Sequence, residues 1–433
     1  MVSQRFWSFS RGVRGLVVAA SLLLLCIGGC KQPSVKSKTE IRSIHMAGVY
    51  AEAARTLAAE FEQQTGVHVR IVAAPLLSLR EKEVTDLLTQ QDDFDVMQVP
   101  HQWEGEILPH LLPLEGSPVS AQPDLSDFIP TVRNNCGRWE GQMRGIPMAC
   151  DLITLLYRTD IFAARSAEFQ TLTGRPLLPP KTWQEYLEIA RFLNSETLYG
   201  NIIMGVEQNF TVWSGILFGM GGRLVDDAWH PRLNSVAGAQ SLSLFAEMFN
   251  YAPPGSESLN FTEANALFLQ GRGAMYLTWP SLLWAQLQDT NICKITGKIG
   301  AAVIPGGKPQ LSAWCLGINP FCKHPEQARK WIEFFTNQSN SKRLMLQYGK
   351  GSPRISTYQD PECKEKILYL SDVLAGFAGN EPRLKIPPSQ ELSDYMDLQI
   401  LKVIHGEFTP QAALDRTAAR WAEILTQTGY LKR

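Results

Sequence analysis

The feature that most constrains the fold is an alternation of strand and helix patterns near the start of the chain. Short apolar strand patterns are separated by segments with apolar residues at helical spacing, and Gly66 follows the first helix, where a residue free to adopt the left-handed conformation is favoured. In chain order the predicted strands and helices are Ile41–Met46, 51–64, Val67–Val72, 81–88 and Phe94–Val99. Such alternation predicts an α/β fold with a mostly parallel sheet, whose ligands bind beyond the carboxyl ends of the strands.

The first thirty residues indicate export from the cytoplasm. Three arginines and no acidic residue precede an apolar run that starts at Leu16 and ends in Ile27-Gly28-Gly29-Cys30. This pattern predicts a signal peptide at residues 1–29, since the run is too short to span a bilayer. It resembles the lipobox of bacterial lipoproteins, which implies acylation of Cys30 and a tether at residues 30–40. The alternative is an ordinary secretory signal with an incidental cysteine, and both place the mature chain outside the cytoplasm.

Composition excludes several classes of partner. Without its leader the chain has 38 basic and 42 acidic residues, a mild excess of negative charge that does not suggest nucleic acid or an anionic lipid surface. With 45% hydrophobic and 19% charged residues the chain is globular, and its length predicts two or more domains. No other apolar run has the length of a membrane helix, so the acyl group on Cys30 is expected to be the only membrane attachment.

Six cysteines remain after the leader and Cys30 are set aside. Outside the cytoplasm they allow up to three disulfides with 15 possible connectivities. The sequence does not choose among these connectivities, nor between disulfide bonding and simple burial of the thiols. None of them forms a CxxC or Cys/His pattern, so we expect no metal and no cofactor. These cysteines are Cys136, Cys150, Cys293, Cys315, Cys322 and Cys363.

Further along the chain, three helices carry clear start signals. Thr182 with Glu185 forms a capping box before the amphipathic segment Trp183–Leu193, Pro325 opens a helix that runs to Thr336, and Thr409 caps the last helix. Two linking passages, 139–157 and 271–307, combine glycines and prolines with extended patterns. Both are candidates for crossings between lobes.

Taken in order, many short fragments resemble the carbohydrate-binding family of extracellular solute-binding proteins that serves ABC importers and includes maltose-binding protein. The resemblance runs from about Ile41 to Tyr430. The fragments are Phe61–Val69, Phe94-Asp95-Val96, Trp103, Leu111–Leu114, Trp139–Gly141, Gly145-Ile146-Pro147, Asp151, Leu156–Phe162, Pro180–Trp183, Gly221-Gly222, Gly273-Ala274-Met275, Pro305-Gly306-Gly307 and Ala412–Leu414.

This resemblance implies a two-lobe periplasmic-binding-protein type II fold with the ligand held in a cleft between lobes. The first lobe is expected to hold residues 41–150 and 280–335, and the second residues 151–279 and 336–433, with crossings near Pro147 and Trp279. The implied function is that of a periplasmic, lipid-anchored monomer that captures a sugar or oligosaccharide and delivers it to the permease subunits of an ABC importer.

The resemblance also selects candidate ligand-binding residues. A sugar presents a face of C–H groups and an edge of hydroxyls, so aromatic platforms and polar side chains are expected. For most candidates a structural role in the core, a cap or an exposed position remains an alternative, and at His101 and Gln102 the family more often has Asp or Asn. The candidates are Tyr50, His101, Gln102, Trp103, Asp151, Glu207, Trp213, Trp279, Trp314 and Arg354.

The residues offer little support for an enzyme. No nucleophile elbow, HExxH pair or phosphate loop occurs, although a glycoside hydrolase needs only two carboxylates and is not excluded by motif. Within the binding class, the alternatives are glycerol phosphate, a polyamine or ferric ion as ligand, or a receptor lobe that presents its ligand to a sensor.

Overall fold

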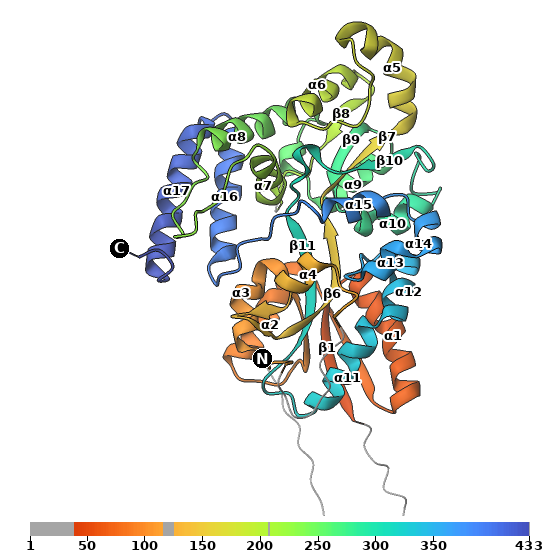
Figure 1. Ribbon diagram of the computed structural model, residues 1–433, viewed down its shortest axis with the longest axis vertical. Helices are drawn as coiled ribbons and strands as arrows, with labels where there is room; N and C mark the ends of the chain where they lie inside the picture. Colours follow the sequence, from red (N-terminus) through yellow and green to blue (C-terminus); the bar gives the residue numbers. More distant parts are fainter. Residues whose placement is uncertain (1–38, 116–124, 207, 433) are drawn as a thin grey trace, which may run out of the picture. The chain divides into compact units, whose positions relative to one another are not determined.

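The computed structural model describes residues 39–115, 125–206 and 208–432. The predicted signal peptide, Cys30, most of the tether and Glu207 lie outside the described residues. Within them the chain forms two larger sheets, each with its own helices (Figure 1). No helix in these ranges combines the length and the apolar character needed to cross a membrane.

The first sheet has five strands in the order β2-β1-β3-β11-β6. β1 pairs in parallel with β2 and β3, whereas β11 runs antiparallel to β3 and β6. The three predicted strands near the start of the chain are confirmed, and four of the five strands run in one direction, as predicted for a mostly parallel sheet. Only β11, which enters from far along the chain, runs in the opposite direction. Its strands are β1 (Glu40–Met46), β2 (His68–Ala74), β3 (Val96–Pro100), β6 (Gly145–Leu152) and β11 (Leu311–Ile318).

The second sheet has four strands in the order β10-β7-β9-β8. β7 runs antiparallel to both of its neighbours, and β8 is parallel to β9. A separate two-stranded hairpin, β4 (Arg138–Trp139) with β5 (Gln142–Met143), turns at Glu140 and Gly141, both with positive φ. This hairpin is the tight turn expected before Pro147. The strands of the second sheet are β7 (Thr154–Arg158), β8 (Tyr199–Ile202), β9 (Gly273–Thr278) and β10 (Ile299–Ala302).

The helices divide between the two sheets. Those packed with the first sheet, directly or through one another, come from the start of the chain and from residues 325–376. They are α1 (Val49–Thr65), α2 (Leu76–Leu88), α3 (Glu104–Ile107), α4 (Pro130–Asn135), α11 (Pro325–Thr336), α12 (Gln338–Tyr348), α13 (Ile355–Gln359), α14 (Pro361–Lys366) and α15 (Leu370–Gly376), with 3-10 turns at His101–Trp103 and Leu108–His110.

The helices packed mainly with the second sheet include the last two of the chain, α16 and α17, which lie side by side (Figure 1). The set is α5 (Thr159–Thr173), α6 (Trp183–Leu193), α7 (Asn209–Gly219), α8 (Val236–Met248), α9 (Phe261–Leu269), α10 (Pro280–Gln288), α16 (Ser389–Ile404) and α17 (Pro410–Gln427), with 3-10 turns at Phe249–Tyr251, Ser256–Ser258 and Pro305–Gly307.

The predicted helix ends are confirmed where local chemistry sets them. Thr182 Oγ1 accepts a hydrogen bond from the Glu185 N–H, and the Glu185 carboxylate accepts one from the Thr182 N–H, which completes the capping box of α6. Thr409 caps α17. Gly66 ends α1 with φ of 73°, a conformation that costs glycine little because it has no Cβ.

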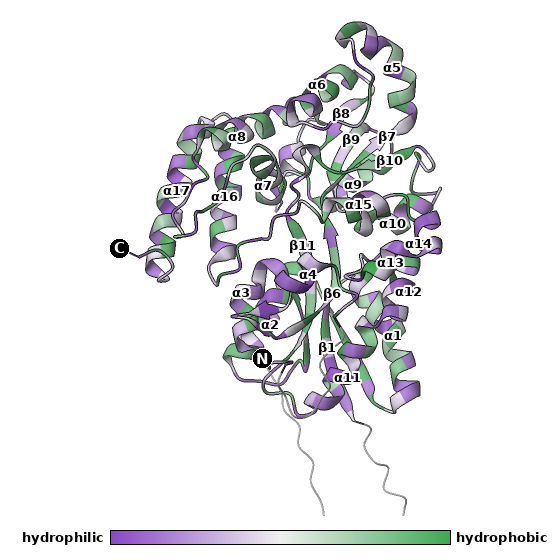
Figure 2. Ribbon diagram, viewed as in Figure 1, coloured by the Kyte–Doolittle hydropathy of each residue, from purple (hydrophilic) through white to green (hydrophobic). Residues whose placement is uncertain are grey.

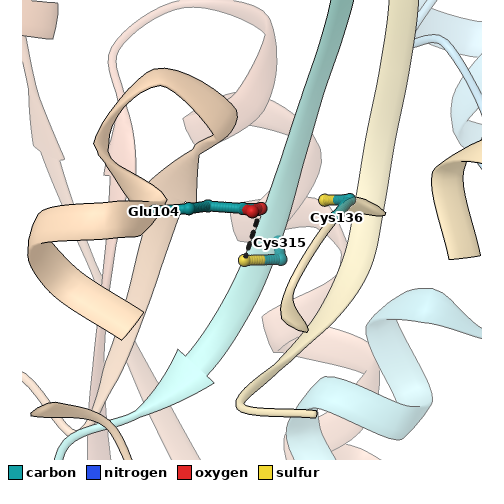
Figure 3. Close-up of side chains that lie close together, drawn as sticks. All are labelled: Glu104, Cys136 and Cys315. Atoms are coloured by element: carbon teal, nitrogen blue, oxygen red, sulfur yellow. Dashed lines mark hydrogen bonds between the residues drawn. The ribbon is translucent and has the colours of Figure 1, made fainter. Parts of the chain in front are cut away.

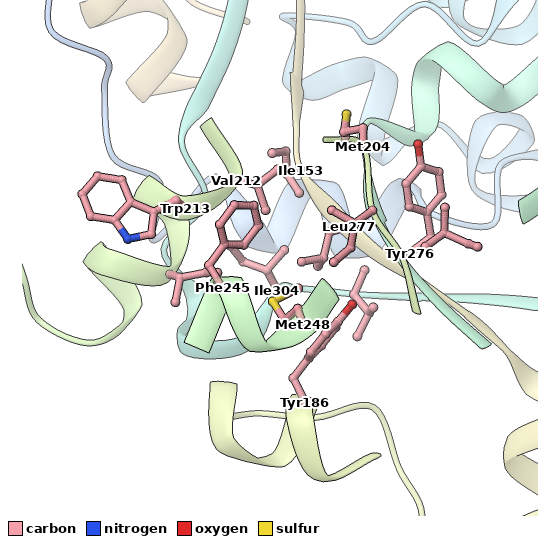
Figure 4. Close-up of a cluster of buried hydrophobic side chains, with 14 of the residues drawn as sticks. Ile153, Tyr186, Met204, Val212, Trp213, Phe245, Met248, Tyr276, Leu277 and Ile304 are labelled. Atoms are coloured by element: carbon pink, nitrogen blue, oxygen red, sulfur yellow. The ribbon is translucent and has the colours of Figure 1, made fainter. Parts of the chain in front are cut away.

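Each sheet has its own buried core. Clusters on the two faces of the first sheet lie against α1 and α11 and against α2 to α4, while a larger cluster surrounds the second sheet. Figure 4 shows part of the larger cluster, where Trp213 of α7 lies near Phe245 of α8. The helices around these cores show both purple and green along their length, as α16 and α17 do in Figure 2, which fits one buried and one exposed side.

The crossings between the sheets differ in part from those expected. Ile153 alone separates β6 of the first sheet from β7 of the second. After Trp279 the chain does not cross, because Pro280 opens α10 and β10 then pairs with β7. It returns only between Gly307 and Leu311. A third crossing, residues 377–388 between α15 and α16, runs beside this one, and the Leu311 N–H donates to the Glu381 carbonyl at 2.8 Å.

Two segments pack with the other sheet from the one expected. Residues 280–302, expected in the first lobe, contribute β10 and much of α10 to the second sheet and its core. Residues 338–376, expected in the second lobe, form helices that pack on α1, α11 and β6. Because these placements depend on pairings between distant segments, the local sequence pattern did not contain them.

Candidate functional site

A pocket with a cavity volume of about 420 Å³ lies where the two sheets meet. One side comes from the carboxyl ends of β1 and β3 and from the starts of α1 and α2, as the alternation of strands and helices predicted. The other side comes from the starts of α9 and α10. Its lining residues are Met46, Ala47, Gly48, Val49, Tyr50, Leu76, Gln102, Asp151, Val206, Gln208, Phe261, Thr262, Trp279, Ser281, Leu282, Ser312, Ala313, Trp314 and Arg383.

Among the described residues that line the pocket, Asp151, near the end of β6, has the only carboxyl group. Its Oδ1 accepts a hydrogen bond from the Leu152 N–H at 2.8 Å, and its Oδ2 accepts one from the Ser281 N–H at 3.1 Å. Burial raises the pKa of Asp151 to about 7, against the opposing effect of these two donors. The group therefore changes its charge near neutral pH.

Trp279 follows β9 and lies with one side in the pocket. Its indole Nε1 donates to Ser312 Oγ at 2.8 Å, so the ring is tied to β11. The Phe261 ring lies 6.3 Å from it, tilted by 56°. An indole held in this way offers a fixed apolar face, and little rotamer freedom is left for a ligand to remove on binding.

Tyr50 and Trp314 form a second aromatic surface. Their ring centroids are 5.0 Å apart and their planes are inclined by 44°. Tyr50 belongs to the first turn of α1, which follows Gly48, and Trp314 stands on β11 directly before a register shift in its pairing with β6. Burial raises the pKa of the Tyr50 phenol, so the hydroxyl keeps its proton and is able to donate a hydrogen bond into the pocket.

Arg383 brings a positive charge to the same pocket. Its Nε donates to the Leu311 carbonyl at 3.4 Å, a long hydrogen bond. No carboxylate lies within ion-pair distance of it among the described residues. Burial lowers the pKa of Arg383 to about 10, which still leaves the guanidinium charged at neutral pH. Its remaining N–H donors are available for a bound molecule.

Five candidates from the sequence line the pocket: Tyr50, Gln102, Asp151, Trp279 and Trp314. Glu207 lies outside the described residues, between Val206 and Gln208, which both line the pocket.

The other four candidates are placed away from the pocket lining. His101 is buried beside Glu104, and burial lowers its pKa to about 4. Trp103 is also buried, and its Nε1 donates to Gln390 at 2.7 Å.

Trp213 and Arg354 have structural contacts as well. Trp213 is fully buried on α7 and its Nε1 donates to Ser241 Oγ at 3.0 Å. Arg354 Nε donates to the Thr336 carbonyl at 2.8 Å, and the guanidinium stacks over Phe128. These contacts correct the expectation that both side chains face the cleft: each is occupied by the packing around it.

The polar and aromatic pocket residues that were not predicted are Gln208, Phe261, Thr262, Ser281, Ser312 and Arg383. One local signal was available, because Asn260 and Glu263 form a capping box that marks the start of α9, the position of Phe261 and Thr262. Ser312 and Arg383 reach the pocket only through the crossings, which no local pattern reveals.

The arrangement suits a small polar molecule with an apolar face. Aromatic rings form the walls, while hydroxyls, amides and, among the lining residues that the structure describes, one carboxyl and one guanidinium supply directional hydrogen bonds. The volume is near the lower end of the roughly 300–1,000 Å³ found for ligand pockets, which favours a compact ligand.

Comparisons with known proteins agree with this geometry. The family described as "Bacterial extracellular solute-binding protein" matches residues 47–342. A Sinorhizobium fredii protein named "Probable amino-acid ABC transporter periplasmic-binding protein y4oP" is 25% identical over 412 residues, 92% of each chain. The mannitol-binding protein of Pseudomonas aeruginosa is 25% identical over 389 residues, 82% of this chain and 85% of its own.

A solved structure has the same fold. It is an ABC transporter solute-binding protein from Agrobacterium radiobacter in complex with ribitol, which superimposes with a TM-score of 0.78 at 24% identity and covers 89% of this chain and 98% of its own.

Proposed function

Because this chain belongs to the family of bacterial extracellular solute-binding proteins, we propose that its pocket captures a small sugar or sugar alcohol for delivery to the permease of an ABC importer. The observation that carries the proposal is the joint placement of Tyr50, Trp279, Trp314 and Asp151 around one cavity between the two sheets. Aromatic faces match the C–H face of such a solute, and the polar groups match its hydroxyls. Relatives named or solved with mannitol and ribitol support this class.

Membership of the family places the protein outside the cytoplasm. We further propose that residues 1–29 are removed and that Cys30 is acylated, so that the binding body is a monomer held at a membrane surface. The sequence pattern of the leader supports acylation. Acyl chains would hold the protein at the membrane, because each buried methylene contributes about 0.8 kcal/mol. Replacing Cys30→Ala should release the protein from the membrane fraction and abolish incorporation of labelled palmitate. Unchanged membrane association of the variant would contradict the anchor.

Two lobes are proposed on the basis of the sheets. The first comprises residues 41–152 and 309–377, and the second residues 154–307 and 380–433. Both contribute walls of the pocket, so a bound solute contacts both and favours an arrangement in which they are close.

A thermal-shift screen followed by calorimetry tests the proposed solute class. We expect hexitols, pentitols, monosaccharides and disaccharides to contain the best ligand, and maltotetraose to bind more weakly, because the cavity volume favours a compact ligand. The proposal would be overturned if none of these sugars and polyols stabilised the protein and a compound of another class did.

An α-amino acid is the second candidate class. Asp151 and Arg383 bring one carboxyl and one guanidinium to the same pocket, and these groups complement an ammonium and a carboxylate. One relative is named for amino-acid transport. The variant Arg383→Gln distinguishes the two classes. It should lower the affinity for an amino acid by about a hundredfold, because a hydrogen bond to a charged group contributes more, and the affinity for a neutral polyol by about tenfold or less.

The family is one of transport rather than of enzymes, and we propose that the solute leaves the pocket unchanged. A glycoside hydrolase needs two carboxyl groups flanking the scissile bond. Chromatography of the solute after prolonged incubation with the protein should return it intact. Appearance of a hydrolysis product that is lost in Asp151→Asn would contradict this.

A further inference from the structure

Two cysteines outside the pocket lie close together in the first sheet region. Cys136 directly follows α4, and Cys315 stands on β11. Their Sγ atoms and a carboxylate oxygen of Glu104 all lie within 4.8 Å of one another, and all three residues are buried. Figure 3 shows both thiols beside the Glu104 carboxylate, to which Cys315 Sγ donates at 3.8 Å.

Close backbone contacts hold the two segments together. A Cβ on Gly137 would lie 2.0 Å from the Gly145 carbonyl oxygen, and a Cβ on Gly145 would lie 2.6 Å from Cys315 Sγ. Gly145 in turn pairs with Gly317 across β6 and β11. The absence of side chains at these positions allows the segment that carries Cys136 to approach the strand that carries Cys315.

The charges around the two thiols do not favour a metal ion. Glu104 already accepts a hydrogen bond from the Gly137 N–H at 2.8 Å, and its Oε2 lies 2.9 Å from Lys385 Nζ. A cation bound to Glu104 and the two thiolates would meet the Lys385 ammonium at close range, in a buried place where repulsion is weakly screened.

We propose that Cys136 and Cys315 form a disulfide in the exported protein. The family places the chain outside the cytoplasm, where disulfides form and persist. Two S–H bonds break and one S–S bond forms; the two electrons pass to the disulfide of an extracytoplasmic thiol oxidant, which also takes up two protons through the solvent and becomes a dithiol. Burial raises the pKa of both thiols once the chain is folded, so the exchange takes place during folding while they are accessible.

The bond joins the end of α4 to the central part of β11 across 179 positions of sequence. Closing so long a loop restricts the unfolded chain and is expected to raise the midpoint of unfolding. The inference is independent of the solute, because neither cysteine lines the pocket.

Peptide mapping of the full chain tests the proposal. The protein is produced with its own leader, extracted from membranes without reductant, alkylated with iodoacetamide in denaturant and digested with trypsin. Cleavage after Arg133 and Arg138 isolates Cys136 in residues 134–138, and cleavage after Lys298 and Lys323 places Cys315 in residues 299–323 together with Cys322. We expect one linked species that is lighter than the two peptides by two hydrogens and separates on reduction, with fragmentation that assigns the bond to Cys315.

Two variants sharpen the result. In Cys136→Ser the thiol of Cys315 should become alkylated, whereas Cys293→Ser, which changes a buried cysteine elsewhere, should leave the linked species intact. Alkylation of both Cys136 and Cys315 in the wild-type protein would overturn the proposal, and so would a linkage of Cys136 to Cys322. Stoichiometric zinc in a protein with both thiols free would overturn it in favour of a metal site.

Discussion

Asp151 Oδ2 accepts a hydrogen bond of 3.1 Å from the backbone N–H of Ser281, although the two residues are 130 positions apart. Asp151 lies two residues before the first crossing, and Ser281 is in the first turn of α10, in the half of the chain built around the second sheet. The carboxyl group thus caps a helix that belongs to the opposite wall of the pocket. A negative charge here is favoured by the helix N-terminus and opposed by burial.

The pH dependence of stability should report on this carboxyl group. Its pKa is about 7 in the folded chain against an ordinary value of 3.8, so the folded state keeps a proton that the unfolded state has lost. The stabilising contribution is complete below about pH 4 and disappears as the pH rises through 7. From pH 5 to pH 8 we expect the wild-type protein to lose roughly 2–3 kcal/mol more than Asp151→Asn in urea unfolding. Parallel pH profiles for the two proteins would refute the assignment.

Trp279 should affect binding although only 7% of the residue is exposed. Trp279→Ala removes a platform and leaves Ser312 Oγ without its indole donor, so we expect solute affinity to fall by at least tenfold. Trp279→Phe keeps a ring but not the hydrogen bond and should fall between wild type and alanine. Calorimetric titration with the best solute from the screen measures both. Equal affinity for all three proteins would show that Trp279 does not contribute to solute binding.

Trp213 provides the matched control on a core tryptophan. It is fully buried on α7, and its Nε1 bonds to Ser241. Trp213→Ala should therefore cost about 3–5 kcal/mol of stability, as large core truncations do. At a temperature where the variant remains folded, its solute affinity should match the wild-type value. A large loss of affinity with little loss of stability would indicate that Trp213 contacts the solute.

Lys350 should give a stability profile of the opposite sign. Its ammonium is buried and donates to the carbonyl of Met148, which sits at the shift in the pairing of β6 with β11. Burial lowers the pKa of Lys350 to about 7. Between pH 7 and 10 the unfolded chain binds the extra proton, so the stability contributed by Lys350 rises with pH. Relative to Lys350→Met, the wild-type protein should gain about 3 kcal/mol over this range in urea unfolding. A difference that stays constant with pH would mean that Lys350 does not lose its proton on folding.

The elements that the sequence predicted correctly are those defined by contacts along a few residues. The capping box of α6, the left-handed Gly66 and the strands β1 to β3 each depend on near neighbours, so the amino-acid pattern contains them. Asp151 and Trp279 were selected through the resemblance to the family, and both line the pocket.

The rest depends on partners far along the chain. Nothing near Trp213 distinguishes a core indole from a platform, because Ser241 of α8 meets its Nε1 only after α7 and α8 pack. Likewise, β10 is assigned to its sheet by pairing with β7, more than a hundred residues earlier. Arg383 reaches the pocket through the third crossing, which runs beside Leu311.

Ile153 is the one residue between two strands that belong to different sheets. A rotation about its φ and ψ angles, with matching changes in the two other crossings at residues 307–311 and 377–388, would reorient the second sheet as a unit and leave the hydrogen bonds of both ladders unbroken. For sensor engineering, two dyes attached on opposite sides of the pocket would change their separation when the solute binds and so report its occupancy optically. No linker needs to be inserted, because the crossings of the backbone already allow the change.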